Sequence, residues 1–108
     1  DWADVIYVPT DNTAASNTEA IANVTVPAKT PVIAGEEGIC KGCGVATLSI
    51  SYYDLGMTTG KMAAKILTGE ADISTMPIEF TTATPKYNAS MCETLGITPL
   101  EGYTAIAE

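Results

Sequence analysis

The sequence of 108 residues contains no histidine and no arginine, and only one tryptophan and one phenylalanine. Without imidazole side chains, a Ser–His–Asp triad and every His-ligated metal site are excluded. Five lysines stand against thirteen acidic residues, which gives a formal net charge of −8. Nucleic acids and anionic membranes attract clustered positive charge, so neither is expected as a partner. No apolar run approaches the ~18 residues that span a bilayer. The amino terminus lacks the basic segment followed by an apolar segment that would predict a signal peptide.

Cysteine is also scarce, at three residues, and an odd number does not suit a disulfide-stapled secreted miniprotein. Cys40 and Cys43 form a CxxC pattern, which is open to three interpretations: a redox pair, a local disulfide or two free thiols. A structural zinc site needs four ligands, and only Cys92 remains to join the pair. Phosphate-loop, dinucleotide-binding and G-x-S-x-G motifs are absent. We therefore predict no metal, no cofactor and no enzyme, with a thiol oxidoreductase using Cys40 and Cys43 as the catalytic alternative.

What is present indicates a single α/β domain, because 46% of the residues are apolar and only 17% are charged. In the first half, short apolar runs rich in β-branched residues predict strands, and a helix-compatible stretch separates the first two. The segment after the second strand is open to an irregular turn or a short helix. The expected strands are 3–9, 31–35 and 45–51, with a helix over 14–24 and the short helix or turn over 39–44. Strands alternating with helices predict a parallel sheet.

The second half begins with a strong helical pattern over Leu55–Leu67, followed by Gly69 as a helix-terminating glycine. Residues 76–82 have the composition of a strand that starts at a proline, as edge strands do. A short helix is expected over 88–95, and the tail is weakly patterned.

Polar residues follow each predicted strand of the first half, where ligands bind in open parallel sheets. The three segments are 10–13, 36–38 and 49–53. Their carboxylates could pair with an ammonium group, their hydroxyls and amides could take a carboxylate, and a tyrosine could stack on a ring. This chemistry suits a small zwitterion. Each part also has a structural interpretation: helix capping for Asp11 and Asn12, a solvated loop for Glu36 and Glu37, and packing for Tyr52 and Tyr53.

Several blocks of the sequence resemble the substrate-binding proteins of ABC transporters, in the branch for tryptophan and tyrosine uptake. The blocks are Val8–Ser16 (VPTDNTAAS), Pro31–Gly38 (PVIAGEEG), Tyr52–Gly56 (YYDLG), Thr59–Leu67 (TGKMAAKIL), Gly69–Asp72 (GEAD) and Met76-Pro77. The resemblance runs from residue 1 to about residue 98. The resemblance is specific in several of these blocks. More remotely, the order of the expected elements is similar to that in the type I sugar-binding periplasmic proteins.

The resemblance implies the three-layer, parallel-sheet lobe of a type I periplasmic-binding-protein fold. Family members have a whole amino-terminal lobe ahead of the segment that matches Asp1, so the sequence looks like a carboxy-terminal fragment. Residues 1–51 would form the core of the carboxy-terminal lobe, and 52–84 a crossover helix and strand belonging to the missing lobe. Residues 85–108 would return to the first lobe. Elements that lack their own sheet are expected to be exchanged between two copies in a homodimer.

The resemblance also implies function. The parent would be the extracytoplasmic, periplasmic or lipid-anchored, solute-binding component of an importer. It would capture an amino acid, an aromatic one first, and deliver it to a membrane permease. A ligand-sensing module of the same fold in a receptor or regulator is the alternative. The ligand-facing positions carried over are Thr10, Asp11, Asn12, Ser16, Glu36, Glu37, Ser51 and Tyr52. Relatives usually lack the CxxC, and the fragment is expected to bind ligand poorly because half the site lies on the other lobe.

Overall fold

The computed structural model describes residues 2–107. The chain forms two compact units, one comprising Asp1–Ser49 with Thr84–Glu108 and the other Ile50–Ala83. We call them the sheet unit and the helix unit. The chain passes between them twice, after Ser49 and before Thr84.

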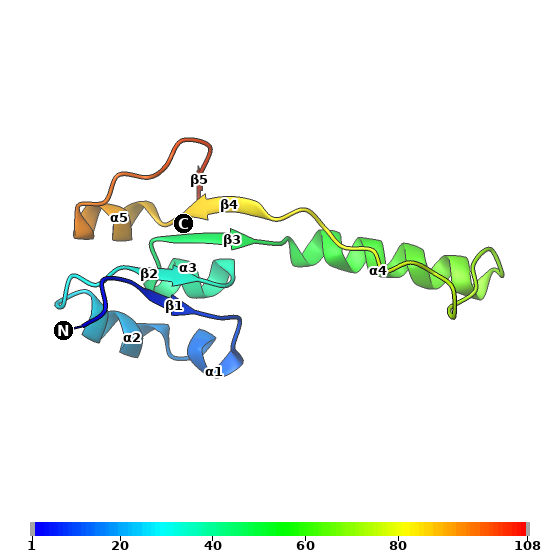
Figure 1. The fold of residues 1–108 in the computed structure, drawn as a ribbon, viewed down its shortest axis with the longest axis horizontal. Coiled ribbons are helices and arrows are strands. Elements are labelled where there is room, and N and C mark those ends of the chain that lie inside the picture. The colour runs from blue at the N-terminus through cyan, green and yellow to red at the C-terminus, as the bar shows by residue number, and fades with distance from the viewer. Residues whose placement is uncertain (1, 108) are drawn as a thin grey trace. The chain divides into compact units, whose positions relative to one another are not determined.

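The sheet unit is built on a five-stranded sheet in the order β1-β2-β3-β4-β5 (Figure 1). β1 (Ile6–Val8), β2 (Val32–Ala34) and β3 (Ala46–Ser49) are parallel neighbours, as expected. β4 (Thr84–Tyr87) runs antiparallel to β3, and β5 (Thr104–Ala105) is parallel to β4. The α/β class is confirmed, and the sheet is mostly parallel; the antiparallel pairing of β4 with β3 is the departure from the expected parallel sheet. The chain leaves at the carboxyl end of β3 and re-enters beside it, so the returning strand runs the opposite way.

Four short helices belong to the sheet unit. They are α1 (Asn12–Ala15), α2 (Thr18–Thr25), α3 (Glu37–Cys43) and α5 (Ala89–Leu95). The single helix expected over 14–24 is therefore two. Ser16 and Asn17 lie at the break, where their side chains donate hydrogen bonds to the carbonyl oxygens of Asn12 and Thr13, each at 2.8 Å. Such side chains compete with the backbone pattern and favour an interruption.

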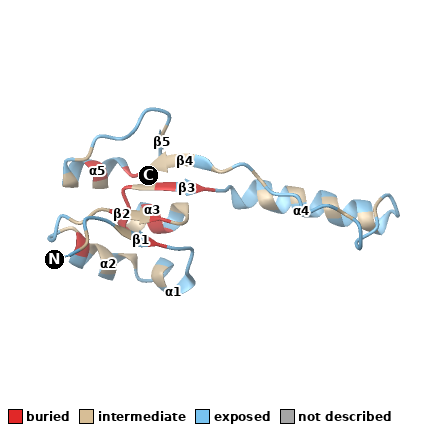
Figure 2. Cartoon of the chain, viewed as in Figure 1, coloured by how far each residue is buried: buried red, intermediate tan, exposed pale blue. Residues whose placement is uncertain are grey.

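The core of the sheet unit lies between the sheet and α3. Its buried members alternate along the strands, as one face of a pleated sheet requires. They are Val8, Val32, Ala34, Ile39, Cys40 and Cys43, with Ala14, Ile21 and Ala22 of α1 and α2 packed against them. Figure 2 shows these buried residues gathered in the strands and α3. The three helices α1, α2 and α3 therefore cover one face of the sheet.

The helix unit is dominated by α4 (Tyr52–Leu67), a 16-residue helix with no buried residue. It begins three residues before the predicted start, because the Ser51 hydroxyl oxygen accepts a hydrogen bond from the Asp54 N–H at 3.2 Å. The strand predicted over 76–82 is wrong. Residues 76–83 form no strand, and the strand lies at Thr84–Tyr87 instead. A strand needs a neighbour to pair with, and within the helix unit none of the described residues forms one.

Among residues 2–107, no helix combines the length and apolar character needed to cross a membrane.

Candidate ligand-binding site

The loops that follow β1 and β2 are joined at the carboxyl edge of the sheet. The Thr10 hydroxyl donates a hydrogen bond to the Gly35 carbonyl oxygen at 3.2 Å, and the Gly35 N–H donates to the Val8 carbonyl oxygen at 2.7 Å. A Cβ at position 35 would lie 2.7 Å from the Thr10 nitrogen. Only glycine therefore allows this close approach of the two backbones. The contact sets the positions of the polar residues that follow each strand.

Asp11 caps α1, since its Oδ1 accepts a hydrogen bond from the Ala14 N–H at 2.8 Å. The prediction that Asp11 caps a helix is therefore confirmed for one of its carboxylate oxygens. The residue itself remains exposed to solvent. Asn12 is the first residue of α1, where it is also exposed. Ser16 lies at the other end of α1, and its hydroxyl bonds back to the Asn12 carbonyl oxygen. Of these residues, Asp11 and Asn12 lie nearest to the end of β1.

Glu36 is the N-cap of α3. Its carboxylate accepts hydrogen bonds from the N–H groups of Gly38, at 2.8 Å, and Ile39. Glu36 is therefore not a freely solvated loop residue, because both of its carboxylate oxygens accept hydrogen bonds from the first turn of α3. This arrangement stabilises α3 and leaves Glu36 half-buried. The hydrogen bonds fix the carboxylate at the start of α3, and a contact of Glu36 with a ligand stays a prediction.

Glu37 is tied to two strands. Its Oε2 lies 2.6 Å from the Lys86 Nζ of β4, and its N–H donates to the Ser49 Oγ of β3 at 3.2 Å. The Lys86 side chain is 30% exposed and that of Glu37 is 38% exposed, so the ion pair is partly shielded from water. Lys86 was not among the predicted site residues. It is one of five lysines and carries no motif, so only the pairing of β3 with β4 brings it to Glu37.

Ser51 and Tyr52 belong to the helix unit, at the start of α4. Ser51 is its N-cap, and Tyr52 and Tyr53 are 62% and 76% exposed. Neither tyrosine is packed into a core in this structure. The sheet unit thus carries Thr10, Asp11, Asn12, Ser16, Glu36 and Glu37 on the segments after β1 and β2, whereas the remaining two candidates lie on the other unit. Their assignment as ligand contacts stays a prediction.

The three cysteines are buried, free thiols. Burial, with smaller contributions from the neighbouring Cys92 and Cys43 and the carboxylates of Glu37 and Glu36, raises the pKa of Cys40 to about 12. Burial also raises the pKa of Cys43 and of Cys92. A catalytic thiol needs the opposite, a lowered pKa and access to its substrate. The CxxC therefore acts here as core packing between α3 and the sheet.

No group of three or more His, Cys, Asp or Glu side chains suited to hold a metal ion occurs among the described residues 2–107.

Known proteins with a similar sequence or fold identify the family of this chain. The chain is 38% identical over 68 residues to a tyrosine-binding protein of Clostridioides difficile, an alignment covering 63% of this chain and 20% of that protein. Among solved structures, it is similar to an ABC domain in complex with L-Trp from Streptococcus pneumonia. The TM-score is 0.78 at 32% identity, with 95% of this chain and 37% of the other covered.

A ligand-free, open substrate-binding protein with adhesive properties from Clostridium difficile is also similar, with a TM-score of 0.75 at 34% identity, covering 94% of this chain and 35% of that one. A conserved domain protein from Vibrio cholerae has a TM-score of 0.78 at 31% identity, over 94% and 36% of the two chains. The chain thus spans little more than a third of these solved relatives. The sequence model of the ABC transporter substrate binding protein family, a family of binding components rather than enzymes, matches residues 1–108. The chain belongs to the ABC transporter substrate-binding protein family.

Proposed function

We propose that this sequence is the carboxy-terminal part of the extracytoplasmic solute-binding component of an ABC importer, and that the whole protein captures an amino acid with an aromatic side chain. The observation that carries the proposal is the coincidence of two features. The family match extends over residues 1–108, and polar side chains follow β1 and β2 at the edge where open α/β sheets bind ligands. Two relatives are named for tyrosine and for L-Trp.

The proposed mechanism is closure of two lobes on the ligand. Asp11 supplies a carboxylate for the ligand's ammonium group, because it is exposed at the end of β1 and only its Oδ1 serves the cap. Thr10 and Asn12 supply a hydroxyl and an amide for the ligand's polar groups. Glu37 contacts the ligand as one half of the ion pair with Lys86, so it adds polar groups to the site without adding net charge. Contacts with both lobes favour the closed form, which is then delivered to the permease.

The test is calorimetric titration of a protein that carries this sequence at the length of its relatives, with L-tryptophan, L-tyrosine and L-phenylalanine. We expect dissociation constants in the micromolar range or tighter for at least one of them. Asp11→Asn should weaken binding by about 10-fold or more, because a charge-assisted hydrogen bond is worth roughly 1.5–3 kcal/mol.

Asp4→Asn is the matched control, since it removes the same charge from an exposed aspartate that precedes β1. Its affinity should equal that of the unmodified protein. Absence of binding by all three amino acids would discard the aromatic ligand. Equal losses in the two variants would mean that net charge, not contact with Asp11, governs affinity.

The isolated 108-residue chain has a second proposed property, a homodimer in which the crossover segment, residues 52–84, is exchanged. The support is that none of the residues 50–83 is buried in the single chain, while several large apolar side chains there are exposed. Light scattering should give twice the monomer mass of 11.2 kDa. A monodisperse monomer would contradict the exchange. Binding of amino acids by this chain alone should be weak or undetectable.

A further inference from the structure

An amino-acid ligand carries a carboxylate, and the candidate positions in the sheet unit supply no positive charge for it. Three of these six positions are acidic, at Asp11, Glu36 and Glu37, and the others carry hydroxyl or amide groups. The formal net charge of −8 means that the protein as a whole also repels an anion. A cationic side chain at this edge would offset that repulsion and offer the carboxylate a charge-assisted hydrogen bond.

The lysines of the sheet unit lie in three different places. Lys29 belongs to the turn ahead of β2, at the amino end of that strand. Lys41 lies in the last turn of α3, where its Nζ donates a hydrogen bond to the Ala107 carbonyl oxygen at 3.1 Å. Lys86 lies on β4, and within the described chain it is the lysine whose ammonium contacts a candidate site residue, Glu37.

The Lys86 ammonium reaches the carboxyl edge of the sheet, although Lys86 itself lies further along the strand pair. Lys86 is paired with Thr47, whereas Ser49 is the last residue of β3. The Lys86 side chain extends to Glu37, whose Oε2 lies 2.6 Å from Nζ, and the Glu37 N–H donates to the Ser49 Oγ at 3.2 Å. Glu37 therefore holds the ammonium near the end of β3, where ligands bind in open parallel sheets.

Hydrogen bonds join this corner to the rest of the candidate site. The Thr10 hydroxyl is bonded to the Gly35 carbonyl oxygen, and Glu37 lies two residues after Gly35 in the chain. The Glu37 N–H continues the connection to Ser49. The segments that follow β1, β2 and β3 therefore begin side by side, and Lys86 adds a positive charge to three segments that contain no lysine.

The Lys86 ammonium has donors left for a second anion. A lysine ammonium carries three N–H groups, and the contact with Glu37 is the described hydrogen bond that it makes. The Lys86 side chain is 30% exposed, so a ligand can approach it. The 2.6 Å contact also limits the positions that this flexible side chain adopts, which lowers the entropy lost when a carboxylate binds.

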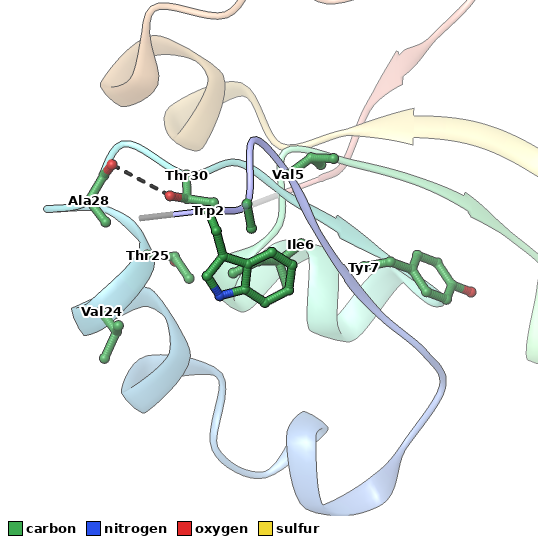
Figure 3. Close-up of a pocket in the computed structure, with 9 residues that line it drawn as sticks. Trp2, Val5, Ile6, Tyr7, Val24, Thr25, Ala28 and Thr30 are labelled. Atoms are coloured by element: carbon green, nitrogen blue, oxygen red, sulfur yellow. Dashed lines mark hydrogen bonds between the residues drawn. The ribbon is translucent and has the colours of Figure 1, made fainter.

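An apolar hollow elsewhere in the sheet unit is a poor place for the same group. It has a volume of about 720 Å³ and lies beside the start of β1, at the opposite end of that strand from Thr10 and Asp11 (Figure 3). Its nine lining residues, among them Trp2, Ile6 and Val24, include no charged side chain. A carboxylate placed there would gain no charged partner to offset its lost hydration.

We propose that Lys86 binds the carboxylate of the amino-acid ligand and that Glu37 positions the Lys86 ammonium for this contact. The ligand's ammonium group pairs with Asp11, as in the proposed function, so each charge of the zwitterion has a separate partner. The inference rests on that proposed function. It adds the residue that distinguishes an amino acid from its amide, which has the same ring and ammonium group but no carboxylate.

Titration with matched pairs of ligands tests the assignment. A protein with this sequence at the length of its relatives is titrated calorimetrically with L-tryptophan, L-tyrosine and L-phenylalanine and with the primary amide of each, at about pH 6 so that every amine is protonated. The unmodified protein should bind the preferred amino acid about 10-fold or more tightly than its amide. Lys86→Met should remove that preference by weakening binding of the amino acid and leaving binding of the amide unchanged. Equal weakening of both ligands would indicate a purely structural role and overturn the proposal.

Lys41→Met is the matched control, because it removes the same charge from the other end of α3. This variant should keep the preference for the amino acid over the amide. A loss equal to that of Lys86→Met would show that net charge, not contact with Lys86, sets the preference, and would overturn the proposal.

A double variant separates direct contact from neutralisation of Glu37. Lys86→Met alone leaves Glu37 unpaired, whereas Glu37→Gln combined with Lys86→Met removes both charges of the ion pair. Direct contact predicts that the double variant still lacks the preference for the amino acid, and return of the preference would overturn the proposal. If none of the three amino acids binds the unmodified protein, the proposed function falls together with this inference. Binding with an unchanged preference in Lys86→Met overturns this inference alone.

Discussion

The sheet unit and the helix unit differ in how they are stabilised. In the sheet unit, apolar side chains from β1, β2 and α3 bury one another, and Ile39 is 0% exposed. In the helix unit, α4 has good caps and a regular apolar stripe but buries nothing. Leu67, Ile78 and Phe80 are each more than 80% exposed there, at 86%, 90% and 86%. A segment can therefore have a well-defined local conformation while its apolar surface has no partner in the chain.

The largest expected difference between the units concerns isoleucine truncation. Ile39→Ala should lower the free energy of unfolding of the 108-residue chain by about 2–5 kcal/mol, because it leaves a cavity in the core. Ile78→Ala makes the same change at a site that is 90% exposed in the single chain, so in the monomer it should cost less than about 0.5 kcal/mol. In the proposed exchanged dimer, where a second copy covers the helix unit, the cost should be larger. Urea unfolding followed by circular dichroism measures both. A large loss from Ile78→Ala would mean that a partner buries the helix unit in solution.

Replacing a glycine by alanine should change the free energy of unfolding in opposite directions in the two units. Gly35→Ala places a Cβ 2.7 Å from the Thr10 nitrogen and should destabilise the sheet unit by about 1–3 kcal/mol. Gly56→Ala meets no atom within 4 Å and lies inside α4, so it should stabilise that helix by roughly 1 kcal/mol. Thermal melts of the two variants give the comparison. A loss of stability in Gly56→Ala would indicate that another surface packs closely on α4.

Removal of an N-cap should cost more in the sheet unit. The buried Asn88 amide donates to the carbonyl oxygens of Cys40 and Lys41, at 3.1 and 3.0 Å, and its Oδ1 accepts from the Met91 N–H. Asn88→Ala should cost about 2–3 kcal/mol, since it removes the cap of α5 together with two hydrogen bonds to the end of α3 at a buried site. Ser51→Ala, at the exposed cap of α4, should cost about 1 kcal/mol. Equal costs from urea titrations would contradict this ranking.

The smallest expected effect, over the measured range of pH 8 to 10, is a dependence on alkaline pH that arises in the sheet unit. The pKa of Cys40 is raised from 9.0 to about 12, so above pH 9 the unfolded chain loses a proton that the folded chain keeps. The free energy of unfolding should therefore fall as pH rises from 9 toward 12, by at most about 1.4 kcal/mol per pH unit for this thiol. Stability measured between pH 8 and 10 in Cys40→Ala should have a shallower slope. Identical slopes would remove Cys40 as the cause.

Much of the sheet unit was predictable because its strands are short apolar runs, and because α1 and α5 begin at Asp11 and Asn88, residue types that commonly cap helices. Polar residues after β1 and β2 were expected for the same reason, since a strand that ends at the surface exposes the residues after it. The roles within that set were less predictable. Glu36 is a cap rather than a solvated side chain, and Lys86 reaches Glu37 only because β4 lies beside β3.

The amino-acid sequence by itself determined the α/β class, the helix over 55–67 and the family resemblance, because these depend on local pattern and on residue identity. The tertiary structure decided which residues meet. Residues 76–82 have the composition of a strand but form none, since no partner strand lies in the helix unit, whereas Thr84–Tyr87 becomes β4 because β3 offers an edge. Strand pairing depends on contacts between segments distant in the sequence, and composition alone does not contain that information.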